Sequence, residues 1–179
     1  MKLKLRLVDE LRSSSPFVDA RAVDELRSSS PFAEARVRKF TFSDLKRILE
    51  IEKSSFTTDA YPKSRFAKLA KKHSDGFFVI ENAGKILGYI IGYKTKKNQG
   101  DLDSIAIDPK YRKLGIGKLL LRYILNQFKK KGLRHASLEV RAKNKTAISF
   151  YQNMGFKAKR VVREFYRDKA DAYQMERAI

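Results

Sequence analysis

Residues 112–117 read Arg112-Lys113-Leu114-Gly115-Ile116-Gly117, and this short stretch decides how the rest of the chain is interpreted. An apolar segment at 102–107 predicts a strand before it, and apolar residues at helical spacing predict a helix over 115–131 after it. The two glycines allow tight backbone turns and a close approach to a ligand, and the unpaired amides at a helix start favour negative charge. We therefore expect a pyrophosphate to bind here. Positive charge at the same place comes from Arg112, Lys113 and Lys118.

Other phosphate-binding turns fit this stretch less well. The spacing is Gly-x-Gly without the third glycine of a dinucleotide-binding turn, and no Gly-Lys-Ser/Thr of a nucleoside-triphosphate loop follows. Taken alone, the two glycines also fit a helix start that merely needs a tight turn. The remainder of the chain must therefore decide between these interpretations.

Outside this turn, the chain has the pattern of one mixed α/β domain. A helix capped by Ser43 is predicted after the first strand, and Asn82-Ala83-Gly84 is typical of a hairpin turn. One mixed, mostly antiparallel sheet of six to seven strands with helices on both faces accommodates this order. Strands are predicted at 37–41, 77–81, 86–95, 102–107, 136–140, 157–164 and 172–176. The further helices are predicted at 64–73, 115–131 and 145–153.

Composition excludes several classes of protein. The chain has 179 residues, of which 42% are hydrophobic, so it suits one domain with a core. It contains no cysteine, which excludes disulfides, thiolate metal sites and a cysteine nucleophile, and two histidines suggest no metal site. No apolar run approaches the length of a membrane span, and the start does not resemble a signal peptide. We expect a cytoplasmic protein without a metal or a membrane partner.

Positive charge dominates the composition. The formal net charge is +20, and residues 37–179 carry 33 basic and 14 acidic side chains, or +19 of that total. Such a field attracts phosphates on a nucleic acid, a ribosome or a nucleotide cofactor. A solvated, lysine-rich surface is the alternative, and charge alone leaves both open.

The first 36 residues contain a near-perfect repeat. Residues 8–17 recur letter for letter as residues 23–32, and two copies are too few for a solenoid. A repeat this exact indicates a recent duplication. We therefore interpret residues 1–36 as an extension added to the natural chain, with a flexible arm for a partner as the alternative.

Several spaced motifs resemble the GNAT acetyltransferases. Arg112-x-x-Gly115-x-Gly117 resembles the Arg/Gln-x-x-Gly-x-Gly/Ala signature of that family, in the expected strand–turn–helix position. Residues 138–156 resemble the second conserved block of the family. The end of the chain, with Phe165-Tyr166-x-Asp168, looks like that of the α-amino subgroup. That subgroup includes the RimI-type ribosomal-protein acetyltransferases and the catalytic subunits of N-terminal acetyltransferase complexes. The similarity spans about residues 36–179.

The resemblance implies acetyl-coenzyme A as the acetyl donor and three groups of residues that hold it. The strand backbone that would pair with the pantetheine arm is that of Ile105, Ala106 and Ile107. The pyrophosphate would contact Arg112, Lys113, Leu114, Gly115, Ile116, Gly117 and Lys118. The residues near the pantetheine and the thioester would be Asn144 and Tyr151.

Acetyl transfer to an amine needs a base for the amine and a group that stabilises the leaving thiolate. Glu139 is the candidate base; an exposed strand glutamate, or one paired with Arg141, is the alternative. Tyr151 is the candidate acid, with a packing role as the alternative. A phenol near ~10 protonates a thiolate near ~8.5 poorly, but it still donates a hydrogen bond as charge develops on sulfur.

The acceptor is expected to lie between Tyr61 and Tyr166. Asp59-Ala60-Tyr61 resembles the Glu-Asn-Tyr of the acceptor loop in the complex-type enzymes, with two of three residues changed. The favoured acceptor is a protein or peptide N-terminus, with possible ribosome association or an auxiliary subunit. A lysine or polyamine acceptor is one alternative, and a basic nucleic-acid- or ribosome-binding protein without enzymatic activity is the other.

Overall fold

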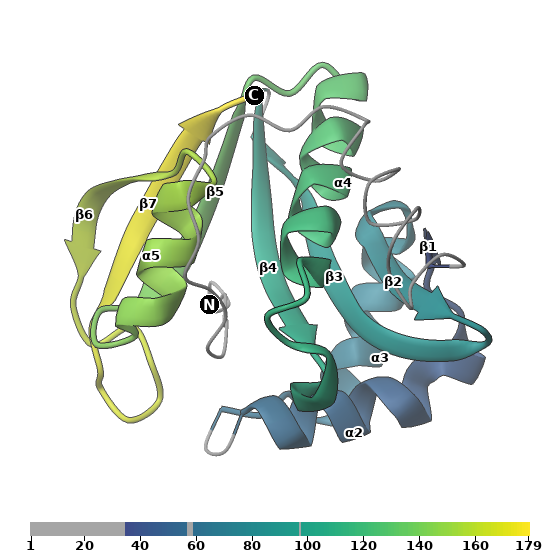
Figure 1. The fold of residues 1–179 in the computed structure, drawn as a ribbon. Helices are drawn as coiled ribbons and strands as arrows, with labels where there is room; N and C mark the ends of the chain where they lie inside the picture. Colours follow the sequence, from purple (N-terminus) through teal and green to yellow (C-terminus); the bar gives the residue numbers. More distant parts are fainter. Residues whose placement is uncertain (1–34, 57–58, 97) are drawn as a thin grey trace.

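The computed structural model describes residues 35–56, 59–96 and 98–179, and these form a seven-stranded sheet with helices on both faces (Figure 1). The strand order is β1-β2-β3-β4-β5-β7-β6. The strands are β1 (Arg36–Lys39), β2 (Phe77–Asn82), β3 (Lys85–Lys96), β4 (Gln99–Ile107), β5 (His135–Arg141), β6 (Lys157–Val162) and β7 (Ala172–Ala178). The α-helices are α2 (Leu45–Ser55), α3 (Lys63–Lys72), α4 (Ile116–Lys130) and α5 (Lys145–Asn153). Short 3-10 helices are η1 (Phe42–Asp44), η2 (Ser74–Gly76) and η3 (Pro109–Tyr111).

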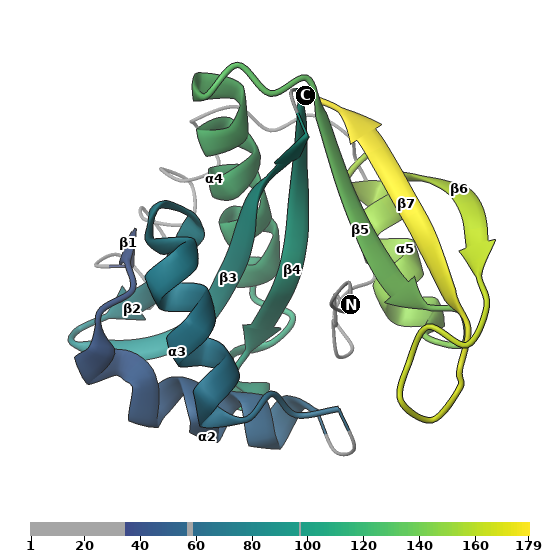
Figure 2. The same cartoon turned by 180° about the vertical axis from the view of Figure 1, so that it is seen from behind.

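The sheet is antiparallel except at its centre, where β4 and β5 run parallel. This parallel pairing covers only three positions, from Gln99 opposite His135 to Asp101 opposite Ser137. Beyond it the two strands separate, and both views show them side by side at one end and apart at the other (Figures 1 and 2). The predicted mixed, mostly antiparallel sheet is confirmed, and the separation is the feature that matters for the site.

Two hydrophobic cores lie on opposite faces of this sheet. Helices α4 and α5 cover one face, where Leu120, Ile124 and Phe150 belong to the larger cluster. Helices α2 and α3 cover the other, where Ile48 and Phe66 pack in a second cluster (Figure 2). Each helix buries an apolar stripe, as the spacing of its residues predicts. The expected helices on both faces are confirmed.

The predicted start of α2 is wrong in detail. Ser43 does not cap the helix; it lies within η1, and its hydroxyl forms a hydrogen bond with Thr41 Oγ1 over 2.7 Å. Asp44 is the residue at the helix start, and its carboxylate accepts a hydrogen bond from Thr41 N (2.8 Å). Arg38 binds the same carboxylate from β1. The helix cap therefore lies one residue later than predicted, at a residue that also forms a tertiary ion pair.

Strand β4 begins three residues before its predicted start at residue 102. Gly100 favours a loop in sequence terms, but here a Cβ atom would come within 2.4 Å of the Phe128 ring. The glycine is therefore part of the strand because α4 packs directly on its backbone. By contrast, the predicted hairpin at residues 82–84 is confirmed, since Ala83 and Gly84 both have positive φ (47° and 74°).

Only part of the predicted boundary between the extension and the domain lies within the described residues. The repeat lies outside the described residues, while Arg36, assigned to the extension, is the first residue of β1. Across the described residues, no helix has the length and apolar character needed to cross a lipid bilayer.

Candidate active site

The turn between β4 and α4 contains two residues whose backbone is in the left-handed conformation. Gly115, the last residue before α4, has φ 80° and ψ −6°, and Lys113 has φ 62° although it carries a side chain. Left-handed backbone is disfavoured for residues other than glycine, so the surrounding structure holds Lys113 in this conformation. Ile116 then anchors the helix start in the core, where it is 2% exposed. The result is a tight loop ending at the amides of α4.

The Arg112 side chain does not add its charge to the outer side of this turn. Its Nε donates to Ile107 O (3.2 Å) and its Nη2 donates to Ser55 Oγ (2.9 Å). The guanidinium therefore fastens the turn to the end of β4 and to α2. Contacts of Arg112–Gly117 amides and of Lys118 with a pyrophosphate remain predictions.

The end of β4 presents backbone groups toward the opening beside β5. Asp108 N donates to Leu87 O on β3 (2.8 Å), and successive residues of a strand alternate in direction. The N–H groups of Ile107 and Ile105 consequently face away from β3, on the side where β5 no longer pairs with β4. This is the arrangement expected if residues 105–107 pair with an extended ligand.

Tyr151 on α5 has a buried hydroxyl that lacks a hydrogen-bond partner within the described part of the chain. The side chain is 0% exposed and packs edge-on against Phe150 and Phe156. Burial, with a further contribution from Tyr166, raises the pKa of Tyr151 well above its usual value. A buried hydroxyl without a partner costs about 1–3 kcal/mol, so this atom points to a ligand group that completes it.

Asn144 has a clear structural role beside this tyrosine. It is the N-cap of α5, and its Oδ1 accepts a hydrogen bond from Ala147 N (2.9 Å). The cap fixes where α5 begins and therefore where Tyr151, two turns along, meets the sheet. The predicted contact of Asn144 with the pantetheine is additional to this role and stays a prediction.

Glu139 lies on β5 on the face covered by α2 and α3, since its neighbours Leu138 and Val140 belong to the core beneath α4 and α5. It is only 5% exposed, and its Oε1 accepts a hydrogen bond from Gln174 Nε2 on β7 (3.0 Å). The exposed strand glutamate considered from sequence is therefore wrong. Pairing with Arg141 is not found either, because that guanidinium binds Asp59 and Asp168.

A second buried carboxylate, missed from sequence, lies on β4. The register of β3 and β4 shifts here, so that Leu102 and Ile105 both enter the α4 core while the two residues between them turn to the opposite face. Asp103 is thereby buried; its Oδ1 accepts from Arg65 Nη2 (3.0 Å) and Tyr93 Oη (3.2 Å), and its Oδ2 has no partner among the described residues. Burial raises the pKa of Asp103.

Asp103 and Glu139 occupy equivalent places on the two separating strands. Each follows by two residues the last paired position, Asp101 on β4 and Ser137 on β5. Both point to the face covered by α2 and α3. Two buried carboxyl groups thus flank the point where the strands separate, in a protein whose net charge is +20.

Tyr61 is held next to this pair by another residue that sequence reasoning missed. Its N–H donates to Glu52 Oε1 (2.7 Å), its hydroxyl reaches Asp103 O (3.4 Å), and Tyr89 donates to the second oxygen of Glu52. The signal for Glu52 was available, because it falls four residues after Ile48 on the apolar side of α2. An acid on an apolar helix face indicates a buried polar contact.

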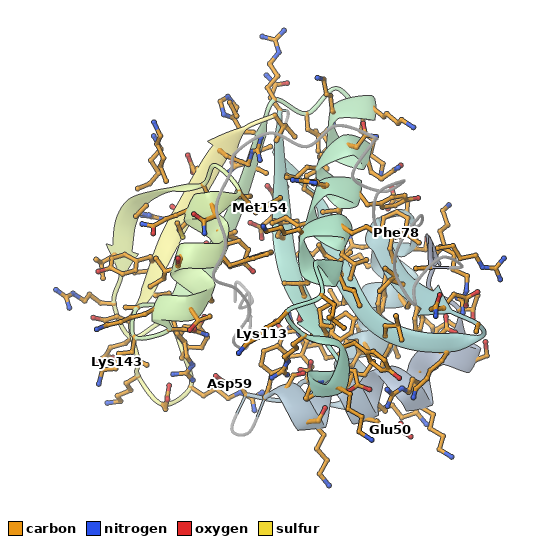
Figure 3. The ribbon with its side chains drawn as sticks, viewed as in Figure 1. Glu50, Asp59, Phe78, Lys113, Lys143 and Met154 are labelled. Carbon is orange, nitrogen blue, oxygen red and sulfur yellow. The ribbon has the colours of Figure 1, made fainter. Side chains whose placement is uncertain are left out.

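Tyr166, the other residue expected at the acceptor, is 2% exposed and lies under the Arg141 guanidinium, whose Cζ is 4.1 Å from the ring centroid. The same guanidinium binds Asp59, near Tyr61, and Asp168, near Tyr166. The structure therefore brings Glu139, Tyr61 and Tyr166 to one region. Figure 3 places Asp59, Lys113 and Lys143 at the end of the molecule where β4 and β5 are apart.

Comparison with known proteins accounts for this arrangement. Residues 44–156, more than half of the chain, match the acetyltransferase (GNAT) family. The chain belongs to this family. The N-alpha-acetyltransferase of Sulfurisphaera tokodaii is 34% identical over 152 residues, covering 78% of this chain and 90% of the relative.

Solved GNAT structures agree with the fold in detail. Ard1 from Thermoplasma volcanium superimposes with a TM-score of 0.78 at 28% identity, covering 81% of this chain and 97% of Ard1. The ribosomal-protein-S18-alanine N-acetyltransferase from Escherichia coli gives a TM-score of 0.71 at 27% identity, covering 81% of this chain and 94% of the neighbour. The family uses acetyl-coenzyme A, so this GNAT enzyme is an acetyl-coenzyme A-dependent acyltransferase.

The residues of this GNAT domain fit that donor. The turn offers helix amides for phosphates, the end of β4 offers N–H groups on a side where β5 does not pair with it, and Tyr151 offers a buried hydroxyl that lacks a partner in the described chain. On the opposite face the site offers the carboxylate of Glu139. We call the first group the donor side, and the group of Glu139, Tyr61 and Tyr166 the acceptor side, after the roles that the sequence predicts for them.

Proposed function

We propose that this enzyme transfers an acetyl group from acetyl-coenzyme A directly to the α-amino group of protein or peptide N-termini. The observation that carries the proposal is the fully buried Tyr151 hydroxyl, for which the described chain supplies no hydrogen-bond partner. It lies on the donor side, close enough to Tyr166 for the two side chains to interact electrostatically. The thioester sulfur is a partner of the right chemistry for this hydroxyl.

Acetyl-coenzyme A supplies the activated acetyl thioester when it is bound. The amides at the start of α4 and the side chain of Lys118 would hold its phosphates, because a helix N-terminus of this length favours an anion. The N–H groups of Ile105 and Ile107 would pair with its extended arm. These roles position the thioester between β4 and β5, within reach of groups on both faces of the sheet.

Tyr151 would act by donating a hydrogen bond to the sulfur as negative charge develops there. Its raised pKa makes complete proton transfer to a thiolate unfavourable, since a free thiol has a pKa near ~8.5. A preorganised donor in a buried site still lowers the barrier, because it stabilises charge that appears only in the transition state. The phenol is thus a better electrostatic partner than an acid.

Glu139 would accept the proton that the acceptor amine loses, directly or through a water. An α-amino group titrates near ~8 and a lysine near ~10.4, so an N-terminal amine reaches its neutral, nucleophilic form far more readily at neutral pH. A carboxylate is a sufficient base for the first and a poor one for the second. This difference supports an N-terminal acceptor over a lysine side chain or a polyamine.

The acceptor backbone would lie between Tyr61 and Tyr166, on the side of the sheet covered by α2 and α3. The relative from Sulfurisphaera tokodaii is named an N-alpha-acetyltransferase, and the neighbour from Escherichia coli is named for the alanine of ribosomal protein S18. The first name describes acetylation of an α-amino group, and the second describes acetylation of an alanine of a ribosomal protein. They support the same class of acceptor for this chain.

Two matched peptides test the proposal. One has a free α-amine and no lysine, and the other has an acetylated N-terminus and a single free lysine; each is incubated with acetyl-coenzyme A and followed by mass spectrometry. We expect the first peptide to gain about 42 Da, because an acetyl group replaces a hydrogen. The second peptide should remain unchanged at neutral pH. Acetylation confined to the lysine peptide would overturn the N-terminal assignment.

A further inference from the structure

The two loops that border the acceptor side come from distant parts of the chain, and one side chain connects them. Arg141 ends β5, and its guanidinium reaches Asp59 before α3 and Asp168 between β6 and β7. Nε donates to Asp59 Oδ2 (3.0 Å), Nη1 donates to Asp168 Oδ2 (2.9 Å), and Nη2 contacts both carboxylates. The loops are 109 positions apart in sequence.

The chemistry of this contact requires an arginine. Its planar fork serves two carboxylates at once while its face stacks on Tyr166 at 4.1 Å, whereas a lysine would supply one point charge. The side chain is 26% exposed and Asp59 only 9%, so solvent screens this pair less than a surface ion pair. Hydrogen bonds from Arg141 lower the pKa of Asp168, as expected for a carboxylate that this guanidinium binds.

Each loop reached by Arg141 also carries a tyrosine of the acceptor side. Tyr61 follows Asp59 by two residues and has its N–H fixed by Glu52. Tyr166 precedes Asp168 by two residues and lies directly under the guanidinium. Moving the guanidinium would therefore move both tyrosines relative to Glu139, which is two residues before Arg141 on the same strand and face.

We propose that Arg141 is a positioning residue for the acceptor, which sets the separation of the loops that carry Tyr61 and Tyr166 by binding Asp59 and Asp168 together. This inference rests on the proposed function, because it assigns the acceptor to the space between those tyrosines. Arg141 also binds the Asp59 carboxylate, which consequently has a structural role rather than a role in proton transfer. The donor side makes no use of this contact.

Steady-state kinetics with the free α-amine peptide tests the role. Arg141→Gln and Asp168→Asn should each raise KM for the peptide about tenfold, because small displacements of positioning groups cost this much or more. The Kd of acetyl-coenzyme A and the melting temperature should change far less. Asp168→Glu keeps a carboxylate and should restore much of the peptide KM, while Arg141→Lys should not.

A matched control lies in the same connection between β6 and β7. Arg163 pairs with Asp171 at 2.6 Å and its side chain is 81% exposed, so Arg163→Gln removes an ion pair of this connection but none of the contacts that Arg141 makes. It should leave the peptide KM unchanged. An unchanged KM in Arg141→Gln, or an equal loss of acetyl-coenzyme A affinity and peptide affinity, would overturn the positioning role.

Amide hydrogen exchange gives a readout that does not depend on the identity of the acceptor. In Arg141→Gln, exchange should rise in residues 59–61 and 165–169 together, and in Asp168→Asn chiefly in 165–169. Arg163→Gln should leave 59–61 as in the wild type. Unchanged exchange in Arg141→Gln refutes the inference, whereas a wild type that acetylates no α-amine refutes the proposed function and leaves the exchange result to stand by itself.

Discussion

The donor side and the acceptor side of this enzyme are built in opposite ways. The donor turn is six consecutive residues, 112–117, in which Lys113 and Gly115 have left-handed backbone. The acceptor side is built from side chains on three separate segments, which carry Tyr61, Glu139 and Tyr166. A site made of consecutive backbone residues can be seen in the sequence. A site made of side chains from distant segments cannot, because the fold must first bring them together.

The largest effect is expected where the two sides meet, at Tyr151. Tyr151→Phe removes one hydroxyl from a buried position, and because no described protein group depends on it, the fold should be as stable or more so. Loss of a preorganised donor to developing charge should lower kcat about 100- to 1,000-fold. Stopped-time assays at saturating peptide measure this change in kcat. A kcat within twofold of the wild type would make Tyr151 a packing residue.

A smaller loss is expected on the acceptor side, from Glu139→Gln. The amide is isosteric and its oxygen still accepts from Gln174, but it cannot accept a proton, so kcat should fall about 10- to 100-fold. The Kd of acetyl-coenzyme A should not change. Gln174→Leu is the matched control, since it removes the neighbour and keeps the carboxylate. Equal losses in both variants would reduce Glu139 to a structural partner.

A modest effect is expected on the donor side, from Gly115→Ala. The residue has φ 80°, a conformation that costs an L-residue about 1 kcal/mol or more. Acetyl-coenzyme A affinity should weaken about fivefold as the turn distorts, with little change in the peptide KM. Calorimetry for the first and kinetics for the second separate the two sides. A change in the peptide KM alone would contradict the division.

The smallest effect on activity is expected far from both sides, at the β1 edge. Hydrogen bonds from Arg38 and Arg36 lower the pKa of Glu81, so this contact stabilises the fold above the usual carboxylate range and is lost as the pH falls through the lowered value. Arg38→Gln should cost about 1–2 kcal/mol of unfolding free energy at pH 7, and less at pH 3. Urea unfolding at both pH values measures this. The folded variant should keep full kcat; a loss of activity would couple this edge to the site.

Sequence predicted those parts of the molecule that depend on local rules. The hairpin at Ala83 and Gly84 needs two positive φ values, and the sequence Asn82-Ala83-Gly84 is sufficient to predict it. The helix start at Gly115 was visible for the same reason. The predicted strand at 102–107 left Gly100 out, because the place of Gly100 in β4 depends on the Phe128 ring that packs on it from another element.

Side-chain partners across the sheet lay beyond sequence reasoning. Glu139 was identified as a candidate base, but its partner Gln174 depends on the β5–β7 register. Asp103 was missed because a shift of register turns it to the acceptor face against the alternation of the strand. Pairing of Arg141 with Glu139 was only an alternative in the sequence analysis, and the structure instead pairs Arg141 with carboxylates on two distant loops.

The most direct test of the donor side is calorimetric titration of acetyl-coenzyme A into wild-type protein and Gly117→Asp. An acid in the first turn of a helix favours the helix itself, so this variant should stay folded, which circular dichroism checks. Its carboxylate, however, lies where the phosphates would bind. We expect binding heat for the wild type and none for Gly117→Asp at the same concentrations. Equal binding by the two proteins would show that the turn at 112–117 does not hold the donor.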